Sequence, residues 1–185
     1  MESFKVLVVG DLCSIRYDFL PSLLQLSSTN KMEYFLTDLS NPETPLSSLF
    51  QNYAFILFFV DMQNERTWRI CRKGIAETTI SYALLKSCLV VKDLDNSTRH
   101  AFSGKDVADT AAAKHIQLVS FSNRNPTEES NAVQAIYRLF TNASSLSMSS
   151  LPVGNDVLPF VLSPVFCKAS QSACIPFFLH LTSTG

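Results

Sequence analysis

The strongest constraint on the fold is the segment AFILFFV at residues 54–60, an uninterrupted run of uncharged, apolar side chains. A strand with one face in water alternates apolar and polar residues, whereas a continuous apolar run predicts a strand that is covered on both faces. Such strands occur mainly in parallel sheets with helices on both sides. This segment therefore predicts a strand at the centre of such a sheet.

Strand and helix patterns alternate along the rest of the chain. The expected strands are residues 4–9, 32–39, 54–60, 87–91 and 116–121, and the expected helices are residues 15–26, 64–86, 104–115 and 126–146. Residues 40–48, with two prolines, are expected to form a loop. The alternation predicts a doubly wound α/β domain with a mainly parallel sheet and helices on both faces.

The last part of the chain has a different composition. Residues 144–185 contain one aspartate, one lysine and one histidine, and prolines stand at positions 152, 159, 164 and 176. The prolines interrupt the apolar run 157–181, which disfavours a membrane span and favours packing on the domain or on a partner. We expect an α/β domain over residues 1–150 and a low-charge C-terminal tail over residues 151–185.

Charge and cysteine usage exclude several functions. The net charge of −1 and the pI near 6.3 provide no basic surface for nucleic acid. The five cysteines include no C-x-x-C pair, so neither a zinc site nor a disulfide framework is expected. Polar residues interrupt the N-terminal apolar run, so no secretory signal is expected. We expect a protein of the nucleus or cytoplasm without metal or membrane contact.

The segment FKVLVVGDLCSIRY begins like a phosphate-binding loop, because an apolar strand ends at Gly10. Counting the pattern G-x-x-x-x-G-K-[ST] from Gly10 places Ile15 at the second glycine, Arg16 at the lysine and Tyr17 at the hydroxyl residue. A β-branched side chain stands where the backbone must approach phosphate, and the tyrosine hydroxyl is too far from the backbone to replace serine. The loop is therefore degenerate, and no bound cofactor is expected.

In a doubly wound sheet, ligands bind beyond the carboxyl ends of the strands. The polar residues expected at that edge are Gly10-Asp11, Asp38, Asp61, Lys92-Asp93-Leu94-Asp95 and Ser122-Asn123. Asp61 is also expected to cap the helix that follows it.

Residues 4–146 resemble the small GTPase (Ras-like) family in the order and character of their elements. The segment SCLVVKDLD resembles the strand before the guanine-reading motif N-K-x-D, of which only Asp95 is retained. Ser122-Asn123-Arg124 stands in the place of S-A-K, and Asp38 in the place of the magnesium-contacting D-x-x-G. Only 43 residues separate Gly10 from Ala54, which leaves no room for the two switch segments. The resemblance implies a reduced P-loop-like fold without GTPase activity, a pseudo-GTPase.

Among pseudo-GTPases the chain resembles the centromere protein M family, through VLVVGD, FILFFVDMQNERTW, SCLVVKDLD and SSLPVGNDVL. That resemblance implies a non-catalytic subunit of the constitutive centromere-associated complex of the inner kinetochore, in the nucleus. Its implied role is complex assembly and chromosome segregation in dividing cells, with centromere proteins I, H and K as partners. The candidate partner-binding residues are Trp68, Arg69, Arg72 and Lys73, because tryptophan and arginine are enriched at protein interfaces. A solvated helix face explains the three cations equally well, and core packing explains the tryptophan.

Two other functions fit parts of the same pattern. One is an atypical GTP-binding small GTPase or a GTPase-like subunit in intracellular trafficking. The other is an unrelated flavodoxin-like or response-regulator receiver domain, because Asp61 in FFVDMQ resembles a phosphoacceptor aspartate. The receiver pattern also requires an acidic pair after the first strand and a lysine after the fifth. Here Asp11 is a single acid, and FSNRNP replaces the lysine-proline pair.

Overall fold

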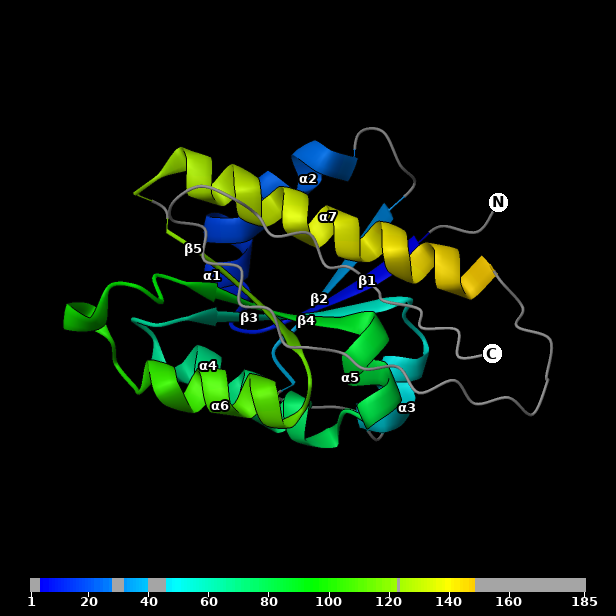
Figure 1. Ribbon diagram of the computed structural model, residues 1–185, viewed down its shortest axis with the longest axis horizontal. Coiled ribbons are helices and arrows are strands. Elements are labelled where there is room, and N and C mark those ends of the chain that lie inside the picture. The colour runs from blue at the N-terminus through cyan, green and yellow to red at the C-terminus, as the bar shows by residue number, and fades with distance from the viewer. Residues whose placement is uncertain (1–3, 28–31, 40–45, 123, 149–185) are drawn as a thin grey trace, which may run out of the picture.

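The computed structural model describes residues 4–27, 32–39, 46–122 and 124–148. These residues form a five-stranded sheet with the order β2-β1-β3-β4-β5, in which every neighbouring pair is parallel (Figure 1). The strands are β1 (Phe4–Val9), β2 (Met32–Thr37), β3 (Phe55–Asp61), β4 (Ser87–Lys92) and β5 (Gln117–Phe121). The mainly parallel α/β fold predicted from the apolar strands is confirmed.

Helices cover both faces of the sheet, as Figure 1 shows. One layer consists of α1 (Leu12–Ser14), the π-helix η1 (Ile15–Phe19), α2 (Leu20–Ser27) and α7 (Pro126–Met148). The other consists of α3 (Leu46–Gln51), α4 (Glu65–Glu77), α5 (Ile80–Lys86) and α6 (Gly104–Ala113), and a short 3-10 turn, η2 (Ser97–Arg99), follows β4.

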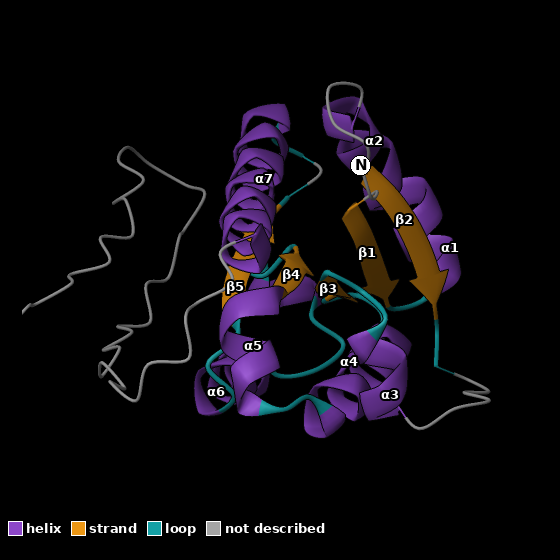
Figure 2. Cartoon of the chain, turned by 90° about the vertical axis from the view of Figure 1, so that its right-hand side faces the viewer, coloured by secondary structure: helices purple, strands orange, loops and turns teal. Residues whose placement is uncertain are grey.

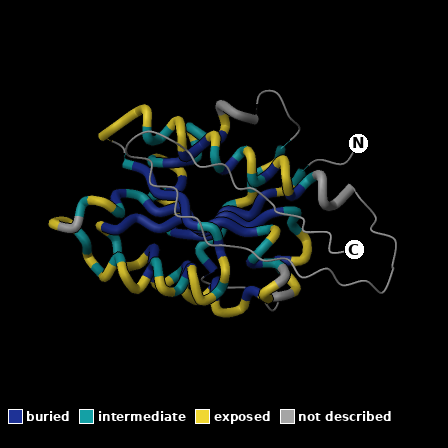
Figure 3. The backbone as a smooth tube through the Cα atoms, in the orientation of Figure 1, coloured by how far each residue is buried: buried dark blue, intermediate teal, exposed yellow. Residues whose placement is uncertain are grey.

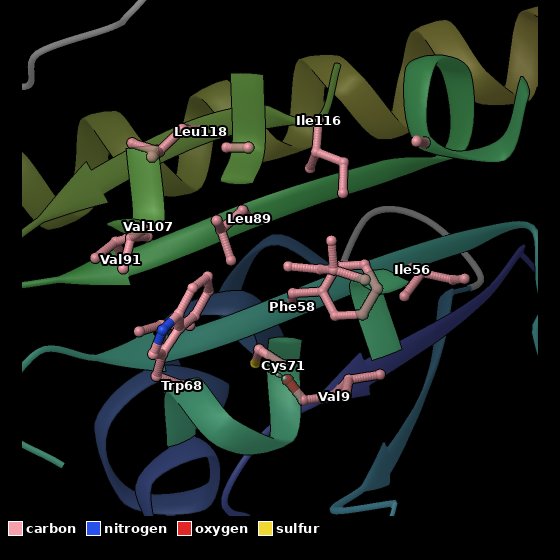
Figure 4. Close-up of a cluster of buried hydrophobic side chains, with 14 of the residues drawn as sticks. Val9, Ile56, Phe58, Trp68, Cys71, Leu89, Val91, Val107, Ile116 and Leu118 are labelled. Carbon is pink, nitrogen blue, oxygen red and sulfur yellow. Dashed lines mark hydrogen bonds between the residues drawn. The ribbon is translucent and has the colours of Figure 1, made fainter. Parts of the chain in front are cut away.

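The central strand β3 explains the apolar run in the sequence, because all of its residues are buried (Figure 3). Ile56, Phe58 and Val60 point into the core cluster beneath α4 and α6, part of which Figure 4 shows. The alternate residues Phe55, Leu57 and Phe59 pack in the second cluster, beneath α2 and α7. A period-2 strand with helices on both sides needs apolar residues at every position.

The first helical segment begins earlier than the predicted residue 15. Its N-terminus is at Leu12, and it continues as η1 and α2 past Pro21. Proline crowds the carbonyl group four residues before it in a regular α-helix. The π turn directly precedes Pro21, and its Leu20 N–H group bonds to the carbonyl oxygen of Ile15, five residues earlier. Such a turn widens the helix locally and accommodates the proline.

Two further predictions are wrong. The expected loop over residues 40–48 overlaps α3, which begins at Leu46, and the expected helix over residues 64–86 is two helices. The break lies at Thr78 and Thr79, which have extended backbone conformations, and not at Gly74. Gly74 instead allows close packing, because a Cβ atom there would lie 2.8 Å from Cε1 of Phe58.

The strand order 2-1-3-4-5 places the topological switch point between β1 and β3. Flavodoxin-like and receiver domains have this order, so the topology alone does not separate the hypotheses drawn from the sequence. The predicted tail, residues 151–185, lies outside the described residues. Within the described part of the chain, the helices are too short or too polar to cross a membrane.

Candidate functional site

The candidate site lies at the carboxyl edge of the sheet, next to the switch point. Two cations form ion pairs with acidic residues at this edge, among them Asp11, Asp38 and Asp61, which were expected there from the sequence. The guanidinium group of Arg66, in the first turn of α4, lies 3.5 Å from Asp11 and 3.8 Å from Asp38. The ammonium group of Lys92, at the end of β4, lies 3.1 Å from Asp61 and 3.0 Å from Asp18.

Gly10 directly follows β1, and close packing against β3 requires a glycine at this position. A Cβ atom at this position would lie 2.7 Å from the main-chain oxygen of Phe59 on β3, a distance that a methyl group does not tolerate. The N–H group of Gly10 donates to the carbonyl oxygen of Thr37 at 3.0 Å, which connects β1 to the end of β2. The backbone of Gly10 is therefore engaged by the sheet and has no positive φ.

Asp11 caps the helix that follows β1. Its Oδ2 atom accepts hydrogen bonds from the N–H group of Ser14 at 3.2 Å and from the hydroxyl of Ser14 at 3.3 Å. Helix N-termini attract anions because their first N–H groups lack partners within the helix. Here the carboxylate of Asp11 takes one of these N–H groups, that of Ser14, in the loop that follows β1.

The other phosphate-loop positions do not converge on one place. Ile15 is fully buried in the cluster beneath α2 and α7. Arg16 is exposed, and Tyr17 is 76% exposed on the outer surface of η1. The structure therefore separates the three residues that stand in place of the glycine, lysine and hydroxyl residue.

Lys92 is the central cation of the site, with only 12% of its side chain exposed. Burial lowers the pKa of Lys92, but the hydrogen bonds and negative charges of Asp18 and Asp61 together outweigh it and raise the pKa above 10.5. Lys92 therefore remains protonated at neutral pH, and its charge is balanced by two carboxylates of the same chain. No sequence signal marks Asp18 for this role, because it lies within a helical segment and meets Lys92 only through the fold.

The expectation that Asp61 caps α4 is wrong. Asn64 is the N-cap residue, and its side chain accepts a hydrogen bond from the N–H group of Arg66. Asp61 uses Oδ2 for Lys92 and accepts the N–H group of Gln63 with Oδ1 at 2.9 Å. Both carboxylate oxygens of this buried residue therefore have partners.

Asp93, the next residue after β4, is buried and has a positive φ of 59°. Its carboxylate accepts hydrogen bonds from the side-chain amide of Gln63 at 2.9 Å and from the hydroxyl of Ser122 at 2.7 Å. Its carbonyl oxygen lies 3.0 Å from Nε2 of His100. Ser122 is the one residue that matches the S-A-K motif, and its hydroxyl group is bonded to Asp93.

A hollow of about 330 Å³ lies beside this network, between the ends of β4 and β5. It contains the positions where the resemblance placed the guanine-reading residues. Its walls include Asp95, which is exposed, and also Asn96, Arg124 and Glu128. The amide nitrogen Nδ2 of Asn96 is buried and has no hydrogen-bond partner within the described residues.

Of the four candidate partner-binding residues, Trp68 is a core residue. It lies in the buried cluster that Figure 4 shows and is 7% exposed. Its ring stacks on Phe102 with a centroid distance of 6.0 Å, so it is not a surface anchor. The three cations are exposed on α4. Arg69 pairs with Glu65 at 3.1 Å, the ammonium group of Lys73 lies 3.5 Å from the carbonyl oxygen of Leu39, and Arg72 lines a hollow of about 270 Å³ beside α6.

The described residues contain no cluster of three or more histidine, cysteine or acidic side chains that could hold a metal ion. Cys71 and Cys88 are fully buried, and burial raises the pKa of both thiols. These two residues are therefore core side chains and not reactive nucleophiles.

Comparison with known protein families and with curated proteins gives no match to this chain.

Proposed function

We propose that the protein is a non-catalytic pseudo-GTPase that acts as a structural subunit of a protein assembly. The observation that carries this proposal is Asp11, whose carboxylate caps the helix that directly follows β1. A nucleotide-binding loop leaves the helix N–H groups free for its ligand. In this protein the chain supplies its own anion.

Electrostatics at the sheet edge support the same conclusion. Asp11 and Asp18 lie on the loop and helix after β1, and their cationic partners are Arg66 and Lys92. A phosphate charge about 4 Å from one such carboxylate would meet a repulsion on the order of 4 kcal/mol at an effective dielectric constant of about 20. Ligand binding would also have to compete with the carboxylates for Lys92.

The guanine-reading end supports it as well. Asp95 is the retained residue of the guanine motif, Lys92 is paired with two aspartates, and Ser122 donates to Asp93. Selective recognition of guanine requires several polar groups that are positioned to bond to the base. A single carboxylate leaves most of the polar edge of the guanine base without hydrogen-bond partners. At this end of the sheet, Lys92 and Ser122 are already bonded to aspartates of the same chain.

The identity of the assembly follows from the resemblance to the centromere protein M family. On that basis we propose a role in the inner kinetochore, in complex with centromere proteins I, H and K. The exposed cations Arg69, Arg72 and Lys73 on α4 are the candidate contact residues. Arginine is enriched at protein interfaces and suits acidic partner surfaces.

Calorimetric titration with GTP and GDP in the presence of Mg²⁺ tests the pseudo-GTPase proposal. We expect no binding heat and no change of the melting temperature at millimolar nucleotide. Micromolar affinity for either nucleotide would contradict it.

Co-purification from dividing cells, followed by reconstitution with centromere proteins I, H and K, tests the assembly. We expect a stoichiometric complex that the double variant Arg72→Glu/Lys73→Glu weakens, while the control Lys5→Glu, an exposed lysine on β1, does not. Absence of these proteins from the purified material would refute the kinetochore role and leave the nucleotide result unaffected.

One observation favours the second candidate function, an atypical nucleotide-binding protein of the GTPase type. The hollow at Asp95 is open, and Nδ2 of Asn96 lacks a partner among the described residues. This alternative predicts measurable GTP binding by the unmodified chain, reduced at least about tenfold by Asp95→Ala, because the carboxylate is lost from the base site. Removal of the charge in Arg16→Ala should likewise weaken binding. No nucleotide effect on the unmodified chain excludes the alternative.

A further inference from the structure

The short helix α5 carries apolar side chains that the two buried clusters do not include. Ile80 is 63% exposed, Leu85 is 50% exposed, and Leu84 is half-buried. None of the three belongs to either core cluster or to the residues packed against one. We refer to Ile80, Leu84 and Leu85 as the α5 patch.

Other residues hold α5 on the sheet. Ala83 is fully buried, and the hydroxyl group of Tyr82 donates to main-chain oxygens of Phe50, at 2.7 Å, and Tyr53. Ile80 and Leu85 therefore keep half or more of their surface exposed although these contacts already hold α5 in place. The water-facing side of a surface helix is normally polar, and exposed apolar residues grouped on one short helix indicate a surface that something covers.

The end of α7 lies next to α5. The two helices are in contact, and Figures 1 and 2 show the C-terminal half of α7 at the same end of the sheet as α5. The chain continues from Met148 with residues 149–185. An extended chain advances about 3.3 Å per residue, so the first few of these residues are enough to reach α5.

The composition of this continuation suits an apolar surface. Residues 151–166, LPVGNDVLPFVLSPVF, contain nine large aliphatic or aromatic side chains and a single charged residue, Asp156. Segments that remain solvated have low hydrophobicity and high net charge, and this segment has neither. Prolines at 152, 159 and 164 disfavour a continuous helix and favour an extended course.

We propose that residues 151–166 pack on the α5 patch of the same chain. The occupant is intramolecular because its attachment point, the end of α7, adjoins the patch, which gives the segment a high effective concentration there. Burial of Ile80, Leu84 and Leu85 against this segment removes the apolar surface of both from water. The contact is independent of nucleotide binding and of the kinetochore role.

Photo-crosslinking of the full chain tests the contact. A benzoylphenylalanine residue replaces Leu85, and the matched control places it at Leu24, which is 49% exposed on α2, in the opposite helix layer. We expect crosslinks from position 85 to residues 151–166, and none from position 24 to those residues. In a mixture of isotopically labelled and unlabelled chains, the crosslinks should stay within one chain. Crosslinks between two chains, or no crosslink to residues 151–166, would overturn the proposal.

Hydrogen exchange provides a second test that needs no crosslinker. In the unmodified full chain, amides of residues 151–166 should exchange at least about tenfold more slowly than in an isolated peptide of the same sequence. The double variant Ile80→Asp/Leu85→Asp should remove this protection, whereas Leu24→Asp should preserve it. Peptide-like exchange in the unmodified chain, or protection that survives the double variant, would overturn the proposal, because residues 151–166 would then be solvated or would pack at a surface other than the α5 patch.

Discussion

Replacement of Lys92 by methionine is the most direct test of the network at the sheet edge. The substitution Lys92→Met keeps most of the apolar stem and removes the ammonium group that lies 3.0 Å from Asp18 and 3.1 Å from Asp61. Packing around the stem is therefore largely retained. Any loss of stability then reports on the two charge-assisted hydrogen bonds.

The expected loss follows from the surroundings of the two carboxylates. Each charge-assisted hydrogen bond contributes about 1.5–3 kcal/mol. The side chain of Asp18 is 29% exposed, so water replaces much of what it loses, whereas that of Asp61 is only 10% exposed and retains one main-chain N–H donor. We therefore expect Lys92→Met to lower the free energy of unfolding by about 2–4 kcal/mol. This lies between the effects of breaking exposed and fully buried ion pairs.

Urea unfolding at pH 7, followed by the fluorescence of the single tryptophan, measures this loss. The midpoint should fall while the slope of free energy against urea stays constant. The double variant Asp61→Asn/Lys92→Met should be more stable than Lys92→Met alone, because it no longer buries an uncompensated carboxylate. A loss below about 1 kcal/mol, or a double variant no more stable than the single one, would refute our account of Lys92 as a structural cation.

Three further predictions concern the core and the pH dependence. Gly10→Ala should lower the free energy of unfolding by about 1–3 kcal/mol, because its Cβ atom would meet the carbonyl oxygen of Phe59 at 2.7 Å; an unchanged urea midpoint would contradict this. Trp68→Ala removes the only tryptophan, so its unfolding is followed by far-UV circular dichroism; it should cost about 3–5 kcal/mol, as expected for a buried aromatic ring, whereas Arg69→Ala should leave the midpoint unchanged. Because the pKa of Lys92 is raised in the folded state, its stabilisation is complete below pH 10.5 and is lost as the pH rises through the folded pKa. Urea midpoints from pH 8 to 11.5 should therefore fall more steeply in the unmodified chain than in Lys92→Met, and parallel curves would contradict the assignment.

Much of the fold is predictable because its main signals are local. Burial on both faces requires apolar residues along β3 up to its last residue, Asp61, and that requirement is visible in AFILFFV without any partner strand. Most predicted element boundaries agree with the structure within two residues. The errors occur where tertiary packing decides: α3 begins inside an expected loop, and the break between α4 and α5 falls at two threonines.

The position of the candidate site in the fold was predictable from the sequence, but the ion pairs between its residues were not. The sequence places Asp61, Lys92 and Asp93 after apolar strands, and the carboxyl ends of parallel strands share one edge. It does not indicate that Asp18 and Lys92, 74 residues apart, would pair. That contact depends on the crossing of a helix over a sheet, which no short stretch of sequence encodes.

By itself, the sequence determined that the chain forms buried parallel strands and that its phosphate loop lacks the glycine, lysine and hydroxyl residue. Both follow from side-chain size and polarity at consecutive positions, which need no knowledge of distant residues. Only the tertiary structure decided what replaced that loop. Asp11 caps the helix and Ile15 fills the core, while Tyr17 faces solvent. The cap itself is local, because Asp11 bonds to Ser14 three residues later, but the pairing of Asp11 with Arg66 and the burial of Ile15 depend on groups far along the chain that the fold brings together.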